Sequence, residues 1–358
     1  MDESRVNRVL DNLDKMGMGQ VLVTDPMSIK WLCGYHTEPY ERFLGLYLAR
    51  DAEPVLFANR LFPSPGDAVA SVVAFSDTDD PVALVAGVTR HGEPLGVDKE
   101  LAARWLVPLM DAGAASDFRL GSLAVDRARS IKDDRELELM RQASATNDRA
   151  MEWLVSQVRD GVTEREIASG LLDCYRALGA EDFSFSPIVS FGANAADPHH
   201  ELDDTVLRRS DVVLFDVGCR QGGYCSDMTR AFFWQEATEH QRAVYECVRA
   251  ANEAAEALVA PGVLFSDIDR AARSVIEGAG WGEFFTHRLG HQIGLVDHEP
   301  GDVSSAHHEP VEPGMCFSIE PGIYLEGDVG VRIEDLVIVT EDGCEVINRY
   351  PHDLVVLE

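Results

Sequence analysis

The sequence predicts an α/β (α+β) protein of two domains, residues 1–126 and 127–358, and three observations lead to this fold class. The chain has 358 residues, of which 46% are hydrophobic, so it is long enough to bury two cores. Short apolar runs typical of strands alternate with helical patterns along the whole chain. The polar stretch RARSIKDD, which begins at residue 127, leads into a long helical pattern, and we place the domain boundary there.

The N-terminal domain is expected to begin with an amphipathic helix. In MDESRVNRVLDNLDKMG, the apolar residues Val6, Val9, Leu10 and Leu13 recur at helical spacing. The runs QVLVT, FLGLYLA, EPVLFA and SVVAF follow and are typical of strands. The first segment has no basic start and no continuous apolar centre, so we do not expect it to act as a signal peptide.

The C-terminal domain is expected to lay helices on a mainly antiparallel sheet. Capping-box patterns, TERE from residue 163 and TEHQ from residue 238, mark the starts of two helices. The first helix is expected to end at Gly179 and the second near residues 261–262. Strand runs lie between and after them: DVVLFDVG, MCFSIEPGIY and VGVRIEDLVIVT, the last two joined by a turn that contains glycine.

Composition excludes several classes of function. The formal net charge of −31 argues against a nucleic-acid partner, which needs a concentrated basic surface. This charge is typical of a heavily solvated surface, and it would also attract metal ions. No run reaches the 18 or so apolar residues of a membrane span. The seven cysteines contain no C-x-x-C pair, which favours free thiols in the cytoplasm.

The first candidate site is DVGCRQGGYCSD, which runs from Asp216 to Asp227. Asp216 follows the apolar run VVLF, so its carboxylate needs a hydrogen bond, an ion pair or a metal ion once it is buried. The Gly-Gly pair suits a hairpin that brings the two aspartates together. Taken alone, such a pair is more often part of an ordinary turn than of a metal site.

Three further residues make a metal site the better interpretation: His291 in RLGHQIGL, Glu320 in SIEPGIY and Glu334 in VRIEDLVIV. Each lies in or beside an apolar strand run. Four carboxylates and one imidazole buried together would repel one another strongly without cations. Such an oxygen-rich set suits two divalent ions, such as manganese, cobalt or zinc, better than a single structural zinc ion.

These segments resemble the five-ligand site of the pita-bread metallopeptidases, which include prolidase, aminopeptidase P and methionine aminopeptidase. DVG, GYCSDMTR, GHQIGLVDHE, SIEPGIY and GVRIED match in order, spacing and context, and the likeness covers residues 188–340. The segment around WLCGY is similar to the creatinase-type N-terminal domain of the proline-specific branch. The resemblance therefore implies a creatinase-like domain (1–126) and a pita-bread catalytic domain (127–358). Trp31, Cys33 and Gln292 depart from the residues common in the family, but none is at a ligand position.

The resemblance also implies roles for the ligands. Asp216 would chelate one ion through both oxygens, Asp227 and Glu334 would bridge two ions, and His291 and Glu320 would each complete one coordination sphere. A water or hydroxide between the ions would be the nucleophile, and Glu320 would pass a proton. The expected metal is manganese, with cobalt and zinc as alternatives.

Three more residues are expected to act on the substrate: His199, His298 and Arg332. The first two match family histidines that face the substrate, although the sequence does not separate His199 from its neighbour His200. Arg332 lies two residues before Glu334, and on a strand this spacing puts both side chains on one face. It would either bind the carboxylate of the substrate or balance the charge of the acids.

The two-domain resemblance implies an Xaa-Pro dipeptidase that works as a homodimer. The loop GYHTEPYERF, with its charged residues Glu38, Glu41 and Arg42, is expected to reach the site of the partner and limit substrate length. Two enzymatic alternatives remain: aminopeptidase P-like cleavage of longer peptides, and a creatinase-type reaction on a substrate that is not a peptide. A metal-free binding module would require a lost ligand, and all five are present.

Overall fold

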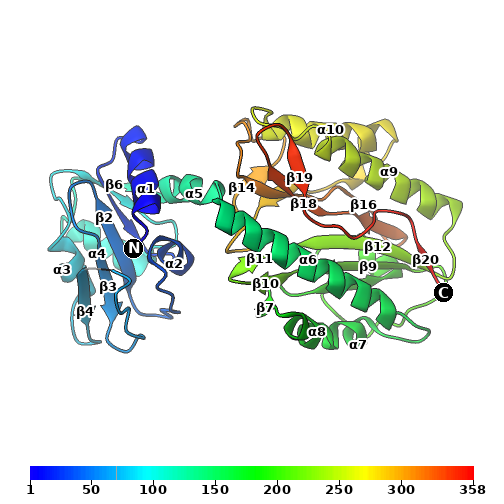
Figure 1. The fold of residues 1–358 in the computed structure, drawn as a ribbon, viewed down its shortest axis with the longest axis horizontal. Coiled ribbons are helices and arrows are strands. Elements are labelled where there is room, and N and C mark those ends of the chain that lie inside the picture. The colour runs from blue at the N-terminus through cyan, green and yellow to red at the C-terminus, as the bar shows by residue number, and fades with distance from the viewer. Residues whose placement is uncertain (70) are drawn as a thin grey trace. The chain divides into compact units, whose positions relative to one another are not determined.

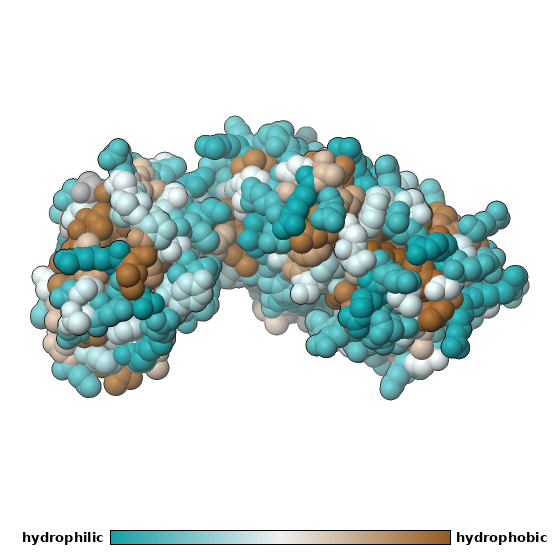
Figure 2. Space-filling model, turned by 90° about the horizontal axis from the view of Figure 1, so that it is seen from below, coloured by the Kyte–Doolittle hydropathy of each residue, from teal (hydrophilic) through white to brown (hydrophobic). Residues whose placement is uncertain are grey.

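The computed structural model describes residues 1–69 and 71–358, which form two units, Met1–Arg129 and Ser130–Glu358. Both units combine helices with sheets (Figure 1), so the predicted α/β (α+β) class is confirmed. No helix in the described ranges is long and apolar enough to span a membrane. Hydrophilic residues cover much of the face drawn in Figure 2, in keeping with the net charge of −31.

The first unit is built around a six-stranded sheet with the strand order β4-β3-β2-β1-β5-β6. Its strands are β1 Gln20–Val23, β2 Leu44–Ala49, β3 Val55–Asn59, β4 Ser71–Phe75, β5 Pro94–Val97 and β6 Asp117–Leu120. Its helices are α1 Glu3–Lys15, α2 Pro26–Cys33, α3 Pro81–Ala86, α4 Ala103–Asp111 and α5 Ser122–Ser130. Helix α1 buries the apolar face predicted for it, and β1 to β4 coincide with the four predicted strand runs.

The helices of the second unit are α6 Asp134–Gln157, α7 Glu164–Ser169, α8 Leu171–Leu178, α9 Glu239–Glu256 and α10 Phe265–Gly278. Both predicted capping boxes are present, at Thr163 and Thr238. The helix expected to run to Gly179 is divided at Gly170, where an added Cβ would lie 2.7 Å from the ring of Trp153. Helix α9 ends at Glu256, before the predicted end.

Four sheets complete the second unit, with the orders β11-β10-β7, β20-β12-β9-β8, β14-β13-β15-β18-β19 and β16-β17. Their strands are β7 Asp182–Phe183, β8 Ile188–Phe191, β9 Val212–Val217, β10 Cys219–Gln221, β11 Tyr224–Cys225, β12 Met228–Trp234, β13 Gly290–Gln292, β14 Glu299–Val303, β15 Cys316–Ile319, β16 Gly322–Leu325, β17 Val329–Arg332, β18 Asp335–Val339, β19 Cys344–Val346 and β20 Val356–Leu357. Most neighbouring strands are antiparallel, as predicted, whereas β12 and β20 are parallel.

The sheet of β9 and β12 lies between two layers of helices. Helices α9 and α10 lie on one side and α7 and α8 on the other in Figure 1. Along β9, Val212 and Leu214 pack with the α9–α10 core, whereas Val213 and Phe215 pack with α7 and α8. Because successive side chains of a strand point to opposite faces, Asp216 lies on the α9–α10 face with Leu214.

Two strand runs that we expected to be continuous are broken, and both breaks lie at predicted ligands. MCFSIEPGIY divides into β15 and β16 around Glu320–Pro321, and VGVRIEDLVIVT divides into β17 and β18 around Ile333–Glu334. Proline has no N–H to donate to the ladder, which accounts for the first break. The breaks lie opposite each other, because Ile319 pairs with Asp335 on one side of them and Gly322 pairs with Arg332 on the other.

Candidate active site

Asp216 and Asp227 come from two paired strands of the central sheet. Asp216 is near the end of β9, where it pairs with Thr229 of β12, and Asp227 directly precedes β12. The intervening chain turns at Gly222 and Gly223, whose φ angles of 59° and 84° favour glycine. The glycine-rich segment is thus a hairpin turn, and it brings two buried aspartates to one place.

The other predicted ligands meet these aspartates. Asp227, His291 and Glu334 each offer a ligand atom, and these atoms lie within 4.8 Å of one another. His291 Nε2 lies 3.6 Å from Asp227 Oδ2 and 3.6 Å from Glu320 Oε1. Asp216 lies near enough for its charge to act on Asp227, Glu320 and Glu334. All five residues selected from the sequence therefore lie in one buried cluster.

The cluster contains more negative charge than the protein neutralises. Burial, followed by the charge of Glu334, raises the pKa of Asp227 well above its usual value. Burial also raises the pKa of Glu334, and that of Glu320 to about 7. Burial and the neighbouring His298 lower the pKa of His291 to about 3, so its imidazole is neutral and free to bind a metal.

Two oxygen atoms of the cluster show directly that it fits metal ions. Asp216 Oδ1 and Asp227 Oδ1 are buried, and neither has a hydrogen-bond partner among the described residues. Buried polar atoms are normally paired, so two carboxylate oxygens without such partners, beside a neutral imidazole, fit the binding of a cation. Carboxylate oxygen together with imidazole nitrogen is a donor set that suits divalent transition metals.

Two hydroxyl groups orient the ligands. Ser318 Oγ accepts from the backbone N–H of His291 (3.0 Å) and donates to Glu320 Oε1 (3.1 Å). Thr229 Oγ1 donates to Glu334 Oε2 (2.7 Å). The sequence analysis missed both residues, although Ser318 lies two positions before Glu320 at the end of β15, and Thr229 lies two positions after Asp227 at the start of β12. In an extended chain this spacing puts the two side chains on one face.

All three side-chain nitrogens of Arg332 donate hydrogen bonds. Nη2 donates to Asp216 Oδ2 (2.6 Å), Nε to Thr229 Oγ1 (3.0 Å) and Nη1 to Tyr324 Oη (2.9 Å). The side chain is only 4% exposed. These contacts favour charge balance and ligand orientation, the second of the two roles considered for Arg332. Tyr324 Oη also contacts Nε2 of the partly buried His287 (2.9 Å), which the sequence analysis missed.

The two predicted substrate histidines lie at the more open side of the cluster. The His298 ring lies 3.8 Å from that of His291, and its side chain is 58% exposed. Arg288 donates to Nδ1 of His298 (3.0 Å). His199 is exposed, and its charge acts on His298. The side chain of His200, in contrast, contacts Glu164 (2.7 Å). The structure therefore distinguishes the two histidines, which the sequence alone did not.

Asp297 is a further acid that the sequence analysis missed. Its Oδ1 is buried without a hydrogen-bond partner among the described residues, and Oδ2 lies 3.5 Å from His298 Nε2. Burial, followed by the charge of Asp216, raises the pKa of Asp297 to about 7. A fifth carboxylate at the site adds to the charge that cations would neutralise.

Comparison with known proteins identifies the family. The model of metallopeptidase family M24 matches residues 138–341, and the model of the creatinase/prolidase N-terminal domain matches residues 5–131. The chain belongs to metallopeptidase family M24. It is therefore a peptidase that depends on metal, and the predicted pita-bread and creatinase-like domains are confirmed.

Relatives of this M24 chain match it over nearly its whole length. An uncharacterized peptidase of Staphylococcus aureus is 34% identical, covering 97% of this chain and 99% of its own. The structure of dipeptidase PepE from Mycobacterium ulcerans has a TM-score of 0.93 at 32% identity, covering 99% of this chain and 97% of its own. A prolidase from Thermococcus sibiricus has the same TM-score and identity, with both chains fully covered.

Proposed function

We propose that this M24 peptidase hydrolyses the Xaa-Pro bond of dipeptides with two divalent metal ions. Asp216, Asp227, His291, Glu320 and Glu334 would hold the ions. The observation that carries the proposal is the pair of buried oxygens on Asp216 and Asp227, which have no hydrogen-bond partner in the described part of the chain and lie beside a neutral imidazole. The similarity to a prolidase and a dipeptidase supports the choice of substrate. Manganese is the proposed metal, with cobalt and zinc as alternatives.

The metal ions would make a bound water acidic and polarise the scissile carbonyl. The protein would supply the proton transfers. Glu320 is the most exposed of the ligand carboxylates, with 16% of its side chain accessible against 12% for Asp216 and 5% for Asp227, and Glu334 is buried. It is therefore the best placed to take a proton from the water and pass it to the departing proline nitrogen.

His298 and His199 would contact the substrate. Because Arg288 donates to Nδ1 of His298, the proton of the neutral ring lies on Nε2, which can donate to the carbonyl oxygen. Arg332 is only 4% exposed, whereas the side chain of Arg288 is 35% exposed. We therefore propose Arg288 as the anchor of the substrate carboxylate, which would take the place of Asp302 on Nη1 (2.6 Å). A proline peptide has no N–H at the scissile bond, and none of these contacts requires one.

The proposal extends to a cytoplasmic homodimer. All seven cysteines are free, which suits a reducing compartment. Symmetric pairs are the commonest assemblies of soluble enzymes. The loop proposed to limit substrate length carries Tyr40, which is 80% exposed at a φ of 51°, and this φ is uncommon for a residue other than glycine. Light scattering would give the mass of the assembly.

The direct test compares peptides after manganese, cobalt or zinc is added to metal-free protein. We expect faster hydrolysis of Leu-Pro than of Leu-Pro-Gly and little hydrolysis of Leu-Ala. Faster cleavage of the tripeptide would favour the aminopeptidase P-like alternative. If creatine is hydrolysed and none of the peptides is, the creatinase-type alternative would be favoured.

The loop of Glu38 to Arg42 is tested separately. Replacing these residues with a Gly/Ser link should raise tripeptide turnover relative to dipeptide turnover and leave metal content unchanged. Arg42 donates from Nε and Nη2 to the two oxygens of Asp77 (2.9 and 3.0 Å). Asp77→Asn is therefore the matched control, because it loosens Arg42 and keeps the loop. An unchanged ratio in the loop variant would remove the loop from the selection of length.

A further inference from the structure

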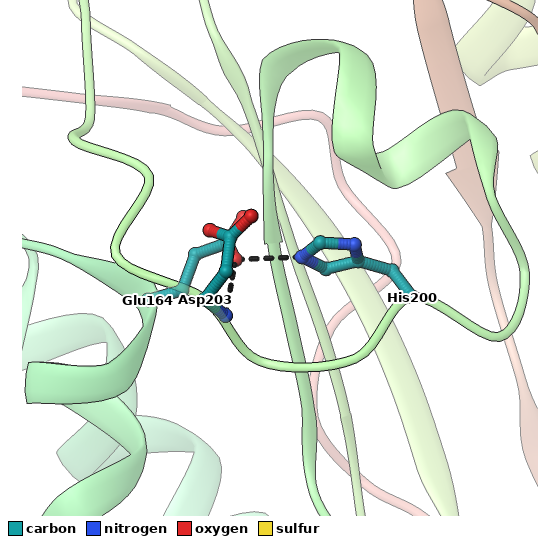
Figure 3. Close-up of side chains that lie close together, drawn as sticks. All are labelled: Glu164, His200 and Asp203. Atoms are coloured by element: carbon teal, nitrogen blue, oxygen red, sulfur yellow. Dashed lines mark hydrogen bonds and ion pairs between the residues drawn. The ribbon is translucent and has the colours of Figure 1, made fainter.

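A second cluster of histidine and carboxylates lies in the same unit (Figure 3): Glu164, His200 and Asp203. Glu164 is the first residue of α7, and its side chain is fully buried. Its Oε1 accepts from the backbone N–H of Phe191 (2.7 Å) and from Asn194 Nδ2 (3.0 Å). Its Oε2 accepts from His200 Nε2 (2.7 Å) and, more weakly, from the backbone N–H of Asp203 (3.4 Å).

These contacts make the cluster a hydrogen-bonding centre and argue against a cation there. Both oxygens of Glu164 already accept hydrogen bonds from N–H groups. The positive hydrogen ends of these groups would repel a cation placed beside the carboxylate. Asp203 is hydrogen-bonded as well, because its Oδ1 accepts a hydrogen bond from the backbone N–H of Thr205 (2.7 Å). Burial raises the pKa of Glu164, and the donors oppose that shift by stabilising the carboxylate.

The donors to Glu164 come from both arms of one loop, residues 192–205, which we call the His199 loop, and from Phe191 just before it. Asn194 lies in the first arm, and His200 and Asp203 lie in the second. Backbone bonds reinforce the attachment, because the N–H groups of Glu164 and Arg165 donate to the carbonyls of Thr205 (3.3 Å) and Asp203 (3.2 Å). The start of α7 therefore holds the loop at several points.

The loop carries His199, which projects from it. His199 is exposed, whereas only 12% of the adjacent His200 side chain is accessible. The backbone N–H of His199 donates to Asp197 Oδ1 (3.0 Å), which fixes the turn at that point. Burial is the main cause of the lowered pKa values of His287 and His298, and the charge of His199 adds to both shifts. His199 thus lies close to the open side of the candidate active site.

We propose that Glu164 and His200 are positioning residues, which hold the His199 loop so that His199 meets the substrate. The inference rests on the proposed function, because it requires that His199 acts on the peptide. Neither residue touches the substrate. Their effect is geometric: a displacement of about 1 Å in a group that acts on the reacting atoms costs on the order of a hundredfold in rate.

The test uses variants of His200 in the full-length, metal-loaded protein. His200→Asn retains a polar amide but is too short to reach Glu164, and it should lower kcat about 10- to 100-fold with little change in KM. His200→Gln extends the same amide by one methylene and should restore most of kcat. Metal content should equal that of the wild type in both. His240→Ala is the control, because it removes an exposed histidine that pairs with Asp328 at 3.1 Å.

The outcomes separate this inference from the proposed function. If His199→Ala loses turnover while His200→Asn keeps kcat within about twofold of the wild type, the positioning inference is wrong and the proposed function stands. Equal losses in the Asn and Gln variants, together with a lower melting temperature or lower metal content, would assign His200 a purely structural role and also overturn the inference. If the wild type cleaves no Xaa-Pro peptide, or His199→Ala is fully active, the proposed role of His199 fails and the inference fails with it.

Discussion

Two clusters in the second unit use the same residue types but differ in burial and in their hydrogen bonds. Asp227, His291 and Glu334 form one, and Glu164, His200 and Asp203 form the other. In the first cluster, Asp227 Oδ1 is buried without a partner among the described residues. In the second, both oxygens of Glu164 accept hydrogen bonds from N–H groups.

The comparison teaches that composition alone does not identify a metal site. A group of His, Asp and Glu residues stabilises a bound cation when its lone pairs lack other partners, and it stabilises a loop when N–H groups already fill them. The first cluster also carries more acids, since Asp216, Asp297 and Glu320 lie beside it. We therefore propose that the first cluster binds metal and that Glu164 and His200 of the second position a loop.

The largest effect is expected from Asp227→Asn. In the proposed site, the amide would remove a negative charge that both ions share. The ions would contribute several kcal/mol of transition-state stabilisation. Turnover of Leu-Pro should therefore fall at least about a thousandfold. Asp203→Asn makes the same change in the second cluster and should keep turnover within about tenfold of the wild type. Near-normal turnover in the Asp227 variant would remove that residue from the site.

A smaller effect is expected from Arg332→Lys, which keeps the positive charge but loses the planar guanidinium group. One ammonium group cannot reach Asp216, Thr229 and Tyr324 in the geometry that Arg332 uses. We expect metal affinity to fall about 10- to 100-fold, as it does when groups that orient ligands are removed. Titration against a competing chelator measures this affinity.

Arg209→Lys is the matched control for the Arg332 variant, since Arg209 pairs with Glu236 at the surface (2.9 Å). Exposed pairs of this kind contribute about 0–1 kcal/mol. Unchanged metal affinity in Arg332→Lys would show that orientation of Asp216 by the guanidinium is unimportant.

No effect on catalysis is expected at Glu256, an acid that belongs to neither cluster. Glu256 Oε1 is buried and has no partner among the described residues. Burial, followed by the charge of Asp335, raises its pKa from 4.5 to about 8, although Arg230 opposes the shift. A carboxyl group with a raised folded-state pKa contributes full stability below pH 4.5, and this contribution is lost as the pH rises towards 8.

Glu256→Gln should therefore increase the free energy of unfolding near pH 8 by a few kcal/mol relative to the wild type. At pH 4.5 the difference should be close to zero. Denaturant unfolding at both pH values measures it, and Glu253→Gln, at a residue whose side chain is 53% exposed, is the control. An equal difference at both pH values would show that Glu256 does not respond to burial by taking up a proton.

Local patterns in the sequence were sufficient to predict several of the elements and to select the candidate ligands. Helix α1, the capping boxes at Thr163 and Thr238 and the first four strands depend on neighbouring residues, and they are confirmed. The five candidate ligands, each of which lies in or beside a strand, meet at one site. Their role as metal ligands stays a prediction.

The contacts that orient these ligands cross long distances in the chain and could not be predicted. Thr229 meets Glu334 across 105 residues, and Arg332 meets Asp216 across 116. No local pattern specifies such pairs. The same holds for His200, whose buried partner Glu164 lies 36 residues earlier, so the sequence left it equivalent to His199. The strand breaks at Glu320 and Glu334 were missed because the apolar pattern continues through them.

The most direct test makes the same type of substitution separately in each cluster. Glu334→Gln and Glu164→Gln each replace a buried carboxylate with an amide of the same shape, and the metal content per chain is measured by mass spectrometry after equal loading with manganese and dialysis. We expect two ions per chain in the wild type and in Glu164→Gln, and the loss of at least one ion in Glu334→Gln. Full metal content in Glu334→Gln, or an equal loss in Glu164→Gln, would contradict the account.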